Sequence, residues 1–279
     1  MYSYDQNKLK EIFYSLLERS IPVESLSRIL ESCSKISEGN KQVFFTSFTA
    51  APRVTGKSPL QVTQSEEETI KQIRKDFTVS NYTVDRLARL FILLHLPAED
   101  KEVYVNTINQ IFPAAEMNEL VALYSGLPLL AHPELWIFRC TEGIRSNIGG
   151  VLEAVICNNP YPAENLDEPA WNQLVMKAFF TEKPVNEIIG LEERANQKLA
   201  DILTDFAHER WAAGRPVPIL LWRLVGPFIS EKNIEDIKRL AKQGSEEEKQ
   251  AATDACRRSN FPPAKALLEE LGSSESRLS

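Results

Sequence analysis

Prolines divide the middle of the chain into segments of similar length, and each segment has the residue pattern of an amphipathic helix. Pro97, Pro113 and Pro128 recur about every 16 residues. A proline disfavours helical geometry in the residue before it, so each one is expected to end a helix or start a turn. Between them, apolar residues recur at intervals of three and four, as on a helix with one buried face. This pattern predicts helices of roughly equal length connected by short turns.

The helical pattern extends to both ends of the chain, whereas strand patterns are scarce. Helical segments are expected at residues 8–18, 66–73, 83–96, 99–112, 115–124, 133–158, 168–178, 197–213, 234–240, 246–257 and 261–271. Residues 43–48 are an apolar run compatible with a helix or a strand. Residues 51–57 (Ala-Pro-Arg-Val-Thr-Gly-Lys) are expected to form a solvent-exposed loop, since proline and glycine commonly mark connections.

The predicted fold class is therefore all-α. Helices of similar length with short connections favour stacked helix pairs, as in an α-solenoid of the HEAT or armadillo kind, or an irregular helical bundle. No repeated sequence motif accompanies the spacing. We expect four parts: an N-terminal helical segment with a loop (1–80), a central helical core (81–229), C-terminal helices packed on that core (230–271) and a disordered polar tail (272–279).

The composition is that of a globular protein and limits the classes of partner. Hydrophobic residues make up 43% of the chain and charged residues 25%, which is far from the composition of disordered chains. The net charge of −7 argues against a general affinity for nucleic acid or anionic membranes. No apolar run reaches the roughly 20 residues that span a bilayer, and the N-terminus lacks the pattern of a secretion signal. We therefore expect a cytoplasmic protein with no nucleic-acid partner and no membrane insertion.

The four cysteines, at positions 33, 140, 157 and 256, lie far apart and form no Cys-x-x-Cys pair. That spacing indicates neither a zinc site nor a redox motif. Free buried thiols are the expectation. No cofactor is predicted.

Polar residues of unlike charge share one face of the predicted helix 133–158. If this helix is continuous, Arg139, Glu142 and Glu153 lie opposite the apolar residues, close to the pair Gly149–Gly150. Two glycines inside a helix cost about 1 kcal/mol each relative to alanine. Either the close approach of another helix or a bound ligand would compensate, and both explanations remain open at this point.

A later predicted helix carries further polar residues of interest. Asp205 and His208 have a spacing that would suit two metal ligands on one helix face. A metal needs more ligands, and a solvated acidic face with one histidine is the plainer alternative. Arg210 falls within the apolar face, so its charge must be paired or reach solvent. Glu142 or Glu153 is a hypothetical partner.

Several uncommon strings occur in order between residues 132 and 229. They are Glu142-Gly-Ile-Arg-Ser-Asn147, Asn159-Pro-Tyr-Pro162, Ala170-Trp-Asn-Gln173 with Lys177-Ala-Phe, Ala207-His-Glu-Arg-Trp-Ala-Ala-Gly-Arg215, and Trp222-Arg-Leu-Val-Gly-Pro-Phe228. In these strings the chain resembles the EboA family. Residues 51–57 look like a weaker N-terminal counterpart, and elsewhere the resemblance is thin.

This resemblance implies a cellular context and no reaction. Members of the family are encoded beside a membrane prenyltransferase-like protein and several homologues of metabolic enzymes. The group is associated with moving metabolite precursors from cytoplasm to periplasm. The implied partners are a small metabolite or other proteins of the same gene cluster, among them the prenyltransferase-like protein.

Three functional hypotheses follow. The first is a non-catalytic accessory protein that binds a secondary-metabolite precursor or a pathway partner in a polar helical groove. Its expected contacts are Arg139, Glu142, Arg145, Asn147, Glu153, Asn172, Lys177, His208 and Arg210. Arginines would hold an anionic group, and tryptophans would offer an aromatic ligand a flat surface. The second is a metal-dependent enzyme that uses Asp205 and His208. The third is a structural adaptor in which the polar residues form an ion-pair network.

Overall fold

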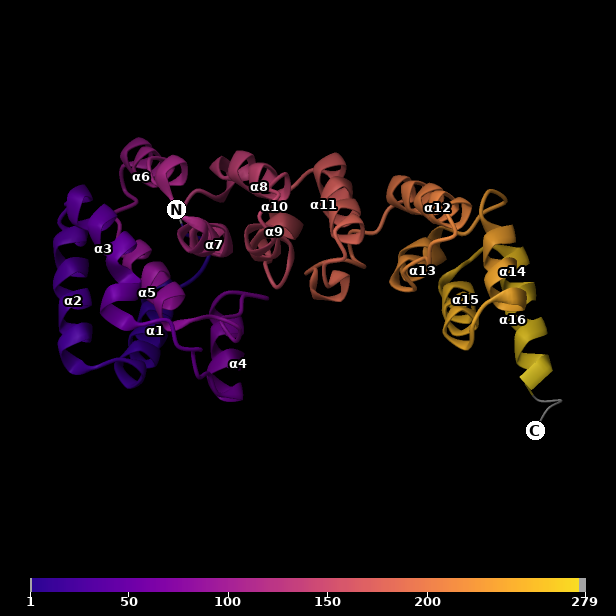
Figure 1. Cartoon of the computed structure of the whole chain (residues 1–279), viewed down its shortest axis with the longest axis horizontal. Helices are drawn as coiled ribbons and strands as arrows, with labels where there is room; N and C mark the ends of the chain where they lie inside the picture. The colour runs from indigo at the N-terminus through magenta and orange to yellow at the C-terminus, as the bar shows by residue number, and fades with distance from the viewer. Residues whose placement is uncertain (1, 276–279) are drawn as a thin grey trace. The chain divides into compact units, whose positions relative to one another are not determined.

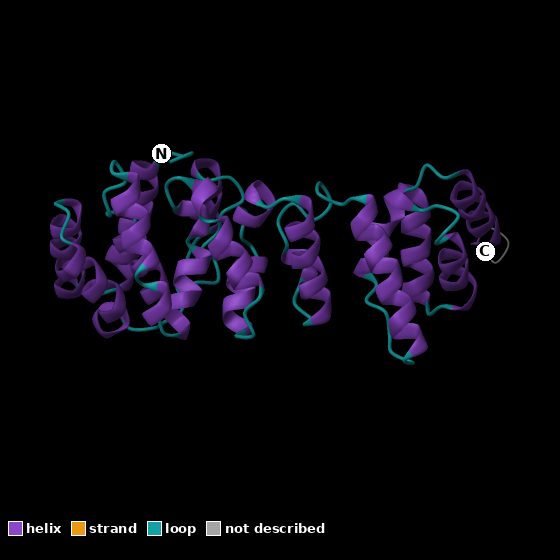
Figure 2. Cartoon of the chain, turned by 90° about the horizontal axis from the view of Figure 1, so that it is seen from above, coloured by secondary structure: helices purple, strands orange, loops and turns teal. Residues whose placement is uncertain are grey.

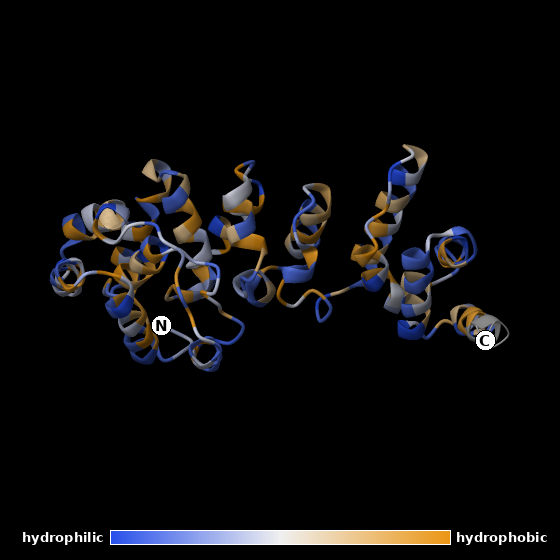
Figure 3. Ribbon diagram, turned by 60° about the horizontal axis from the view of Figure 1, so that its bottom comes forward, coloured by the Kyte–Doolittle hydropathy of each residue, from blue (hydrophilic) through white to orange (hydrophobic). Residues whose placement is uncertain are grey.

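A computed structural model of the protein describes residues 2–275, with side chains up to residue 271. In this part of the chain it contains sixteen α-helices, five short 3-10 helices (η) and no strand (Figures 1 and 2). The prediction of an all-α fold is confirmed. In Figure 3 the helices carry both hydrophobic and hydrophilic residues, as helices with one buried face do.

The described residues form two compact units. The first extends to Trp171 and also includes Glu187–Ile189, and the second consists of Asn172–Asn186 and the chain from Gly190 onward. The boundary lies inside the segment 81–229 that the sequence pattern suggests is one core.

The helices of the first unit cover the N-terminal part of the chain. They are α1 (Gln6–Ser20), α2 (Val23–Ser37), α3 (Lys41–Thr55), α4 (Gln64–Ile73), α5 (Val84–Leu93), α6 (Lys101–Asn109), η1 (Phe112–Ala114), α7 (Met117–Ser125), η2 (Leu127–Leu129), η3 (Pro133–Leu135), α8 (Ile137–Ile144), α9 (Gly149–Ile156) and α10 (Tyr161–Asn165). Helix α11 (Glu168–Phe180) begins in the first unit and continues into the second.

The remaining elements follow α11. They are η4 (Val185–Glu187), α12 (Gln197–Ala212), α13 (Leu220–Val225), η5 (Gly226–Phe228), α14 (Ile234–Gln243), α15 (Glu246–Arg258) and α16 (Pro262–Glu275). Helix α16 thus includes residues 272–275 of the predicted tail, and residues 276–279 lie outside the described residues.

Helix α5 is the centre of the first unit. It packs against α1, α2, α3 and α7, and all of its residues except Arg86 are buried. The run Leu90–Leu94 is apolar all round the helix, a sequence pattern that predicts burial on several sides. Each of its side chains is at most 2% exposed, which confirms that expectation.

Helix α3 includes most of the stretch that was expected to be a loop. Residues 51–55 form its last turn, Ala51 is 2% exposed, and the helix ends only at Gly56, whose φ of 74° is left-handed. The prediction of an exposed loop at 51–57 is therefore wrong for its first five residues. It failed because Pro52 lies inside the helix, where a proline normally breaks the hydrogen-bond ladder.

The bond that this proline removes is replaced by a buried arginine. Pro52 has no N–H to donate to the carbonyl of Phe48, four residues earlier. Arg89 on α5 donates from Nε to that carbonyl oxygen at 3.0 Å. Its Nη1 donates to Asp85 Oδ2 at 2.5 Å, and the two side chains are only 4% and 5% exposed. A buried ion pair on α5 thus satisfies the backbone of α3.

A discontinuous piece of chain completes the first unit. After α9, Asn158 adopts a left-handed conformation with φ 51°. Its backbone N–H donates to the carbonyl of Glu187 at 2.8 Å, and its side-chain Nδ2 donates to Glu187 Oε2 at the same distance. These two bonds connect α9 to η4.

In the second unit, small residues allow helices to approach closely. A Cβ atom on Gly226 of η5 would lie 2.9 Å from the Cα of Ala255 on α15, so only glycine fits there. Helix α15 begins with a capping box formed by Ser245 and Glu248, the pair of residue types typical of a helix start.

Candidate functional site

The nine predicted ligand contacts fall in both units. Arg139, Glu142, Arg145, Asn147 and Glu153 belong to the first, and Asn172, Lys177, His208 and Arg210 belong to the second.

The predicted helix 133–158 is wrong, because the chain turns between Ile144 and Gly149. Helix α8 ends at Ile144 with Arg145 as its cap, and the hydroxyl oxygen of Ser146 accepts a bond from the N–H of Ile148 at 3.1 Å. A face drawn across both α8 and α9 as one cylinder therefore does not exist. The pair Gly149–Gly150 opens α9 and does not lie in a helix interior.

The glycine that needs close packing is Gly143 instead. A Cβ atom there would lie 2.6 Å from Val155 Cγ2 and 2.7 Å from a ring carbon of Tyr124. At Gly150 the nearest atom would be Val121 Cγ2 at 3.5 Å, an ordinary contact. Helix α8 thus meets α7 and α9 at Gly143.

Arg139 is held on several sides by its own unit. Its Nε donates to Asn109 Oδ1 at 2.8 Å, and its Nη1 donates to Glu142 Oε2 at 2.7 Å. The guanidinium carbon lies 4.2 Å from the centre of the Phe112 ring, a cation–π distance. The Tyr124 hydroxyl donates to the same oxygen of Glu142 at 3.2 Å. Arg139 therefore connects α8 with the end of α6, η1 and α7.

The Tyr124 hydroxyl ionises less readily than usual. Burial raises its pKa first, and the neighbouring Glu142 carboxylate raises it further. Tyr124 is thus a hydrogen-bond donor at neutral pH.

The other three predicted contacts of the first unit, Arg145, Asn147 and Glu153, are exposed. Arg145 caps α8, Asn147 lies in the turn and Glu153 lies on α9. They are near one another in sequence and come from separate elements.

The string Asn159–Pro162 has a structural role. Asn159 is 3% exposed, and its Nδ2 donates to the carbonyls of Tyr124 at 3.1 Å and Ala154 at 2.8 Å. The Tyr161 hydroxyl donates to the carbonyl of Pro133 at 2.5 Å. This string thereby joins the start of α10 to α7, α9 and η3.

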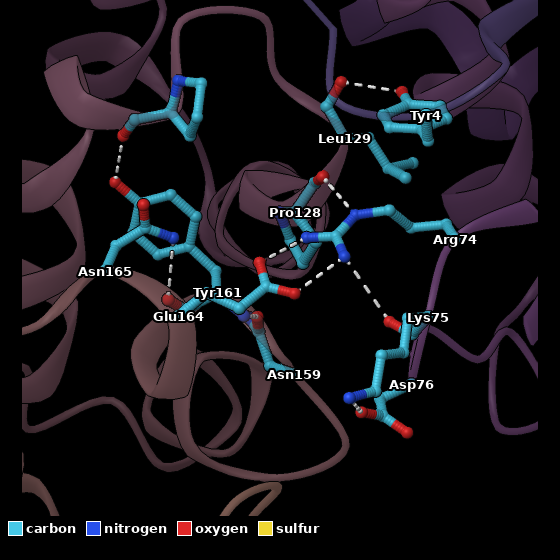
Figure 4. A network of polar contacts seen from close by, with 11 residues as sticks. Tyr4, Arg74, Lys75, Asp76, Pro128, Leu129, Asn159, Tyr161, Glu164 and Asn165 are labelled. Carbon is cyan, nitrogen blue, oxygen red and sulfur yellow. Dashed lines mark hydrogen bonds and ion pairs between the residues drawn. The ribbon is translucent and has the colours of Figure 1, made fainter.

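Beside it, Arg74 makes a two-pronged ion pair that the sequence pattern does not indicate. Its guanidinium donates to both oxygens of Glu164, at 2.7 and 2.5 Å, and from Nε to the carbonyl of Pro128 at 2.9 Å (Figure 4). Arg74 is 6% exposed. Pairs of this geometry are strong and directional, so this one fixes the end of α4 against η2 and α10.

In the second unit, Asn172 is also structural. It is 5% exposed, and its amide exchanges two hydrogen bonds with the amide of Asn196, at 3.2 and 2.8 Å. Asn196 in turn accepts from the N–H of Leu199 and caps α12. Lys177 lies half-buried in the last turn of α11.

The His208 side chain contacts α14, where its Nε2 lies 2.9 Å from Asp236 Oδ2. Asp205, which the sequence spacing offered as a second metal ligand beside His208, lies on the same helix, α12. The His208 ring neighbours Trp211, which stacks on Trp222 at 5.6 Å between centroids and 22° between planes. Within residues 2–275, no three His, Cys, Asp or Glu side chains gather in a way that could hold a metal ion.

Arg210 makes its contacts with residues of its own unit. Its Nε donates to the carbonyl of Pro216 at 2.5 Å, and its guanidinium carbon lies 5.5 Å from the centre of the Phe206 ring. Glu142, in contrast, pairs with Arg139 on its own helix. Glu142 and Arg210 belong to different units, and a pair between them stays a hypothesis.

Arg210 lines a pocket of about 240 Å³, here called the Arg210 pocket. Its lining residues are Phe180, Glu182, Phe206, Glu209, Arg210, Ala213 and Arg215. Phe180 is 72% exposed and its ring lies 6.1 Å from that of Phe206. Among the described side chains, no carboxylate forms an ion pair with Arg210 or Arg215.

Arg210 is the one predicted contact among the lining residues of this pocket, and the other six, which include Phe180, Phe206 and Arg215, were not predicted as contacts. Two signals were present in the sequence. Arg215 follows Gly214, whose φ of 65° ends α12 and turns the chain back. Phe180 is a large apolar residue at the end of α11 that lies outside the apolar face of the predicted helix 168–178.

Cys33, Cys140 and Cys256 are free and buried, as expected, whereas Cys157 is only partly buried. No helix of the described chain has the length and apolarity needed to cross a membrane.

Comparison with protein families gives one match. The family model described as "Metabolite traffic protein EboA" matches residues 9–226. The chain belongs to the EboA family. Membership supports a metabolite-traffic role. The match begins at residue 9, far upstream of the strings at 132–229. The expectation that the resemblance is thin in the N-terminal helices is therefore wrong. Helices α14 to α16 lie beyond it.

Comparisons with curated proteins and with solved structures give no match.

Proposed function

We propose that this EboA-family protein is a non-catalytic accessory protein that binds a small anionic metabolite in the Arg210 pocket. The proposal rests chiefly on one observation: two arginines without an acidic partner line a pocket beside two phenylalanine rings. Other arginines of the chain, such as Arg74 and Arg89, are paired with carboxylates.

The lining residues define the class of ligand. A guanidinium offers paired N–H donors that match a carboxylate or a phosphate. The bond from Nε of Arg210 to Pro216 orients that guanidinium and leaves its two Nη groups for a ligand. Glu182 and Glu209 would accept bonds from hydroxyl or amino groups, and the exposed ring of Phe180 would cover an apolar part.

The size of the pocket restricts the ligand further. Sites for drug-sized molecules and cofactors usually enclose about 300–1,000 Å³, and this pocket has about 240 Å³. A single ring with an acidic side chain fits such a space. In a metabolite-traffic role, the protein would hold this compound for transfer to another protein of the same gene cluster, and the membrane prenyltransferase-like protein would be one such recipient.

Titration calorimetry with phenyllactate tests the proposal, since this probe has a carboxylate, a hydroxyl and one ring. We expect binding that is lost for its neutral amide. A hydrogen bond to a charged group contributes about 1.5–3 kcal/mol, so Arg215→Gln and Arg210→Gln should each weaken binding about tenfold or more. Arg53→Gln, an exposed arginine on α3, is the matched control.

Thermal unfolding of each variant verifies that it is folded. Arg215→Gln is the more informative variant, because Arg210→Gln also removes the bond to Pro216. Equal binding of the acid and the amide, or an Arg215→Gln variant that binds like Arg53→Gln, would refute the proposal.

A further inference from the structure

A separate pocket in the first unit contains one buried carboxyl group among apolar residues. It has a volume of about 220 Å³ and lies between α3, the end of α6, η1 and α7. Its lining includes Phe45, Gln110, Ile111, Ala114, Ala115 and Glu119.

Glu119 is 4% exposed, and only one of its two oxygens has a role within the protein. Oε2 accepts a bond from the N–H of Glu116 at 2.8 Å and closes the capping box at the start of α7. Oε1 is buried without a hydrogen-bond partner. No lysine, arginine or histidine of the described residues forms an ion pair with this carboxylate.

An unpaired buried carboxylate oxygen is costly, because burial removes its hydration and nothing replaces it. The helix cap uses Oε2, whereas Oε1 makes no interaction that would offset the cost of its burial. A glutamine at this position would form the same cap through its carbonyl oxygen. A donor from outside the chain would satisfy this oxygen.

We propose that this pocket is a second binding site, which takes a small primary ammonium compound with a compact apolar body. The ammonium group would donate to Glu119 Oε1, and its charge would balance the carboxylate. The ring of Phe45 and the side chain of Ile111 would contact the apolar body. A cavity of about 150 Å³ holds benzene, so this pocket has room for a ring with an aminomethyl group.

This site differs from the Arg210 pocket in its unit and in the charge of its ligand. The two proposals are independent, because one needs an anion and the other needs a cation. Loss of phenyllactate binding would therefore leave this inference intact, and the reverse also holds.

Ligand-observed NMR with benzylamine tests the site in the full chain. Benzyl alcohol has the same ring without the charge, and benzoate has the opposite charge. We expect benzylamine to bind more tightly than benzyl alcohol and benzoate not to bind. Glu119→Gln should weaken benzylamine binding about tenfold or more, since it removes a charge-assisted bond.

Two further measurements separate a ligand site from a helix cap. Thermal unfolding of Glu119→Gln should match or exceed that of the natural protein, because the cap is kept and a buried charge is removed. Thr49→Phe, at an exposed position on the pocket wall, should abolish binding of benzylamine and of benzyl alcohol. Benzylamine that fails to bind, binds no better than benzoate, or binds unchanged to Glu119→Gln would overturn the inference.

Discussion

Substituting two glycines by alanine should have opposite effects on stability. Gly143 is in the last turn of α8, and Gly150 is in the first turn of α9. On helix propensity alone, alanine is favoured over glycine by about 1 kcal/mol at an interior position. If propensity decided the outcome, both variants would be more stable than the natural protein.

Packing reverses that result at Gly143. A new methyl group would lie 2.6 Å from Val155 Cγ2 and 2.7 and 2.8 Å from two ring carbons of Tyr124, all well inside ordinary contact distance. The Tyr124 ring cannot move freely, because its hydroxyl is bonded to Glu142. Inserting a methyl group into a tight core costs about 1–3 kcal/mol. We therefore expect Gly143→Ala to be destabilised by up to about 2 kcal/mol after the propensity gain.

Gly150→Ala is the matched control. Its new methyl group would meet only Val121 Cγ2 at 3.5 Å, so we expect a change between zero and about 1 kcal/mol in the stabilising direction. Urea unfolding followed by circular dichroism measures both variants. The reasoning about packing at Gly143 is refuted if Gly143→Ala is as stable as Gly150→Ala.

Two further predictions concern charged groups in the first unit. Arg89→Met should lower the free energy of unfolding in urea by about 3–5 kcal/mol, because it leaves the buried Asp85 carboxylate unpaired and the Phe48 carbonyl without a donor. The double variant with Asp85→Leu should recover part of this loss, and an equal loss in the double variant would contradict this account. The hydrogen bond from Arg19 lowers the pKa of Glu66 from 4.5 to about 2, so the stabilising effect of this pair is present above pH 4.5 and declines as the pH falls towards 2. The free energy of unfolding across that range should therefore depend less on pH in Glu66→Gln than in the natural protein. This difference should be smaller in high salt, since the pair is partly exposed and salt screens it. Equal pH dependence of the two proteins would contradict this assignment.

Helix existence was predictable from this sequence because the apolar periodicity is strong. The burial of Leu90–Leu94 and the cap at Ser245 also follow from the residues present. The ambiguous run 43–48 became helix because its neighbours on both sides continue α3. Periodicity alone could not decide this, since a short apolar run fits a helix or a strand.

The errors arose where a tertiary contact overrides a local rule. Pro52 stays inside α3 because Arg89 supplies the missing bond from a different helix, and no local pattern reveals that. The turn after α8 had a local signal in Ser146, which suits a turn, followed by two glycines that open α9. Reading those glycines as interior residues joined two helices into one.

The candidate site could be predicted only in part, for the same reason. Arg210 was recognised as a charge on an apolar face, and the structure places it in a pocket. Its partner could not be deduced, because the carbonyl of Pro216 becomes available only after the chain has turned at Gly214. Glu119 gave no sequence signal, since its isolation depends on which groups surround it.

The two bonds between Asn158 and Glu187 determine how much of the chain must be synthesised before the first unit is complete. The first unit is not contiguous in sequence. Glu187–Ile189 belong to it, although the preceding residues 172–186 belong to the second unit. A nascent chain halted at Trp171 would therefore lack the acceptors for the backbone and side-chain donors of Asn158. Translation must continue through Ile189 before that half of the molecule has all its parts, and a truncated version meant to isolate it would need the same extension.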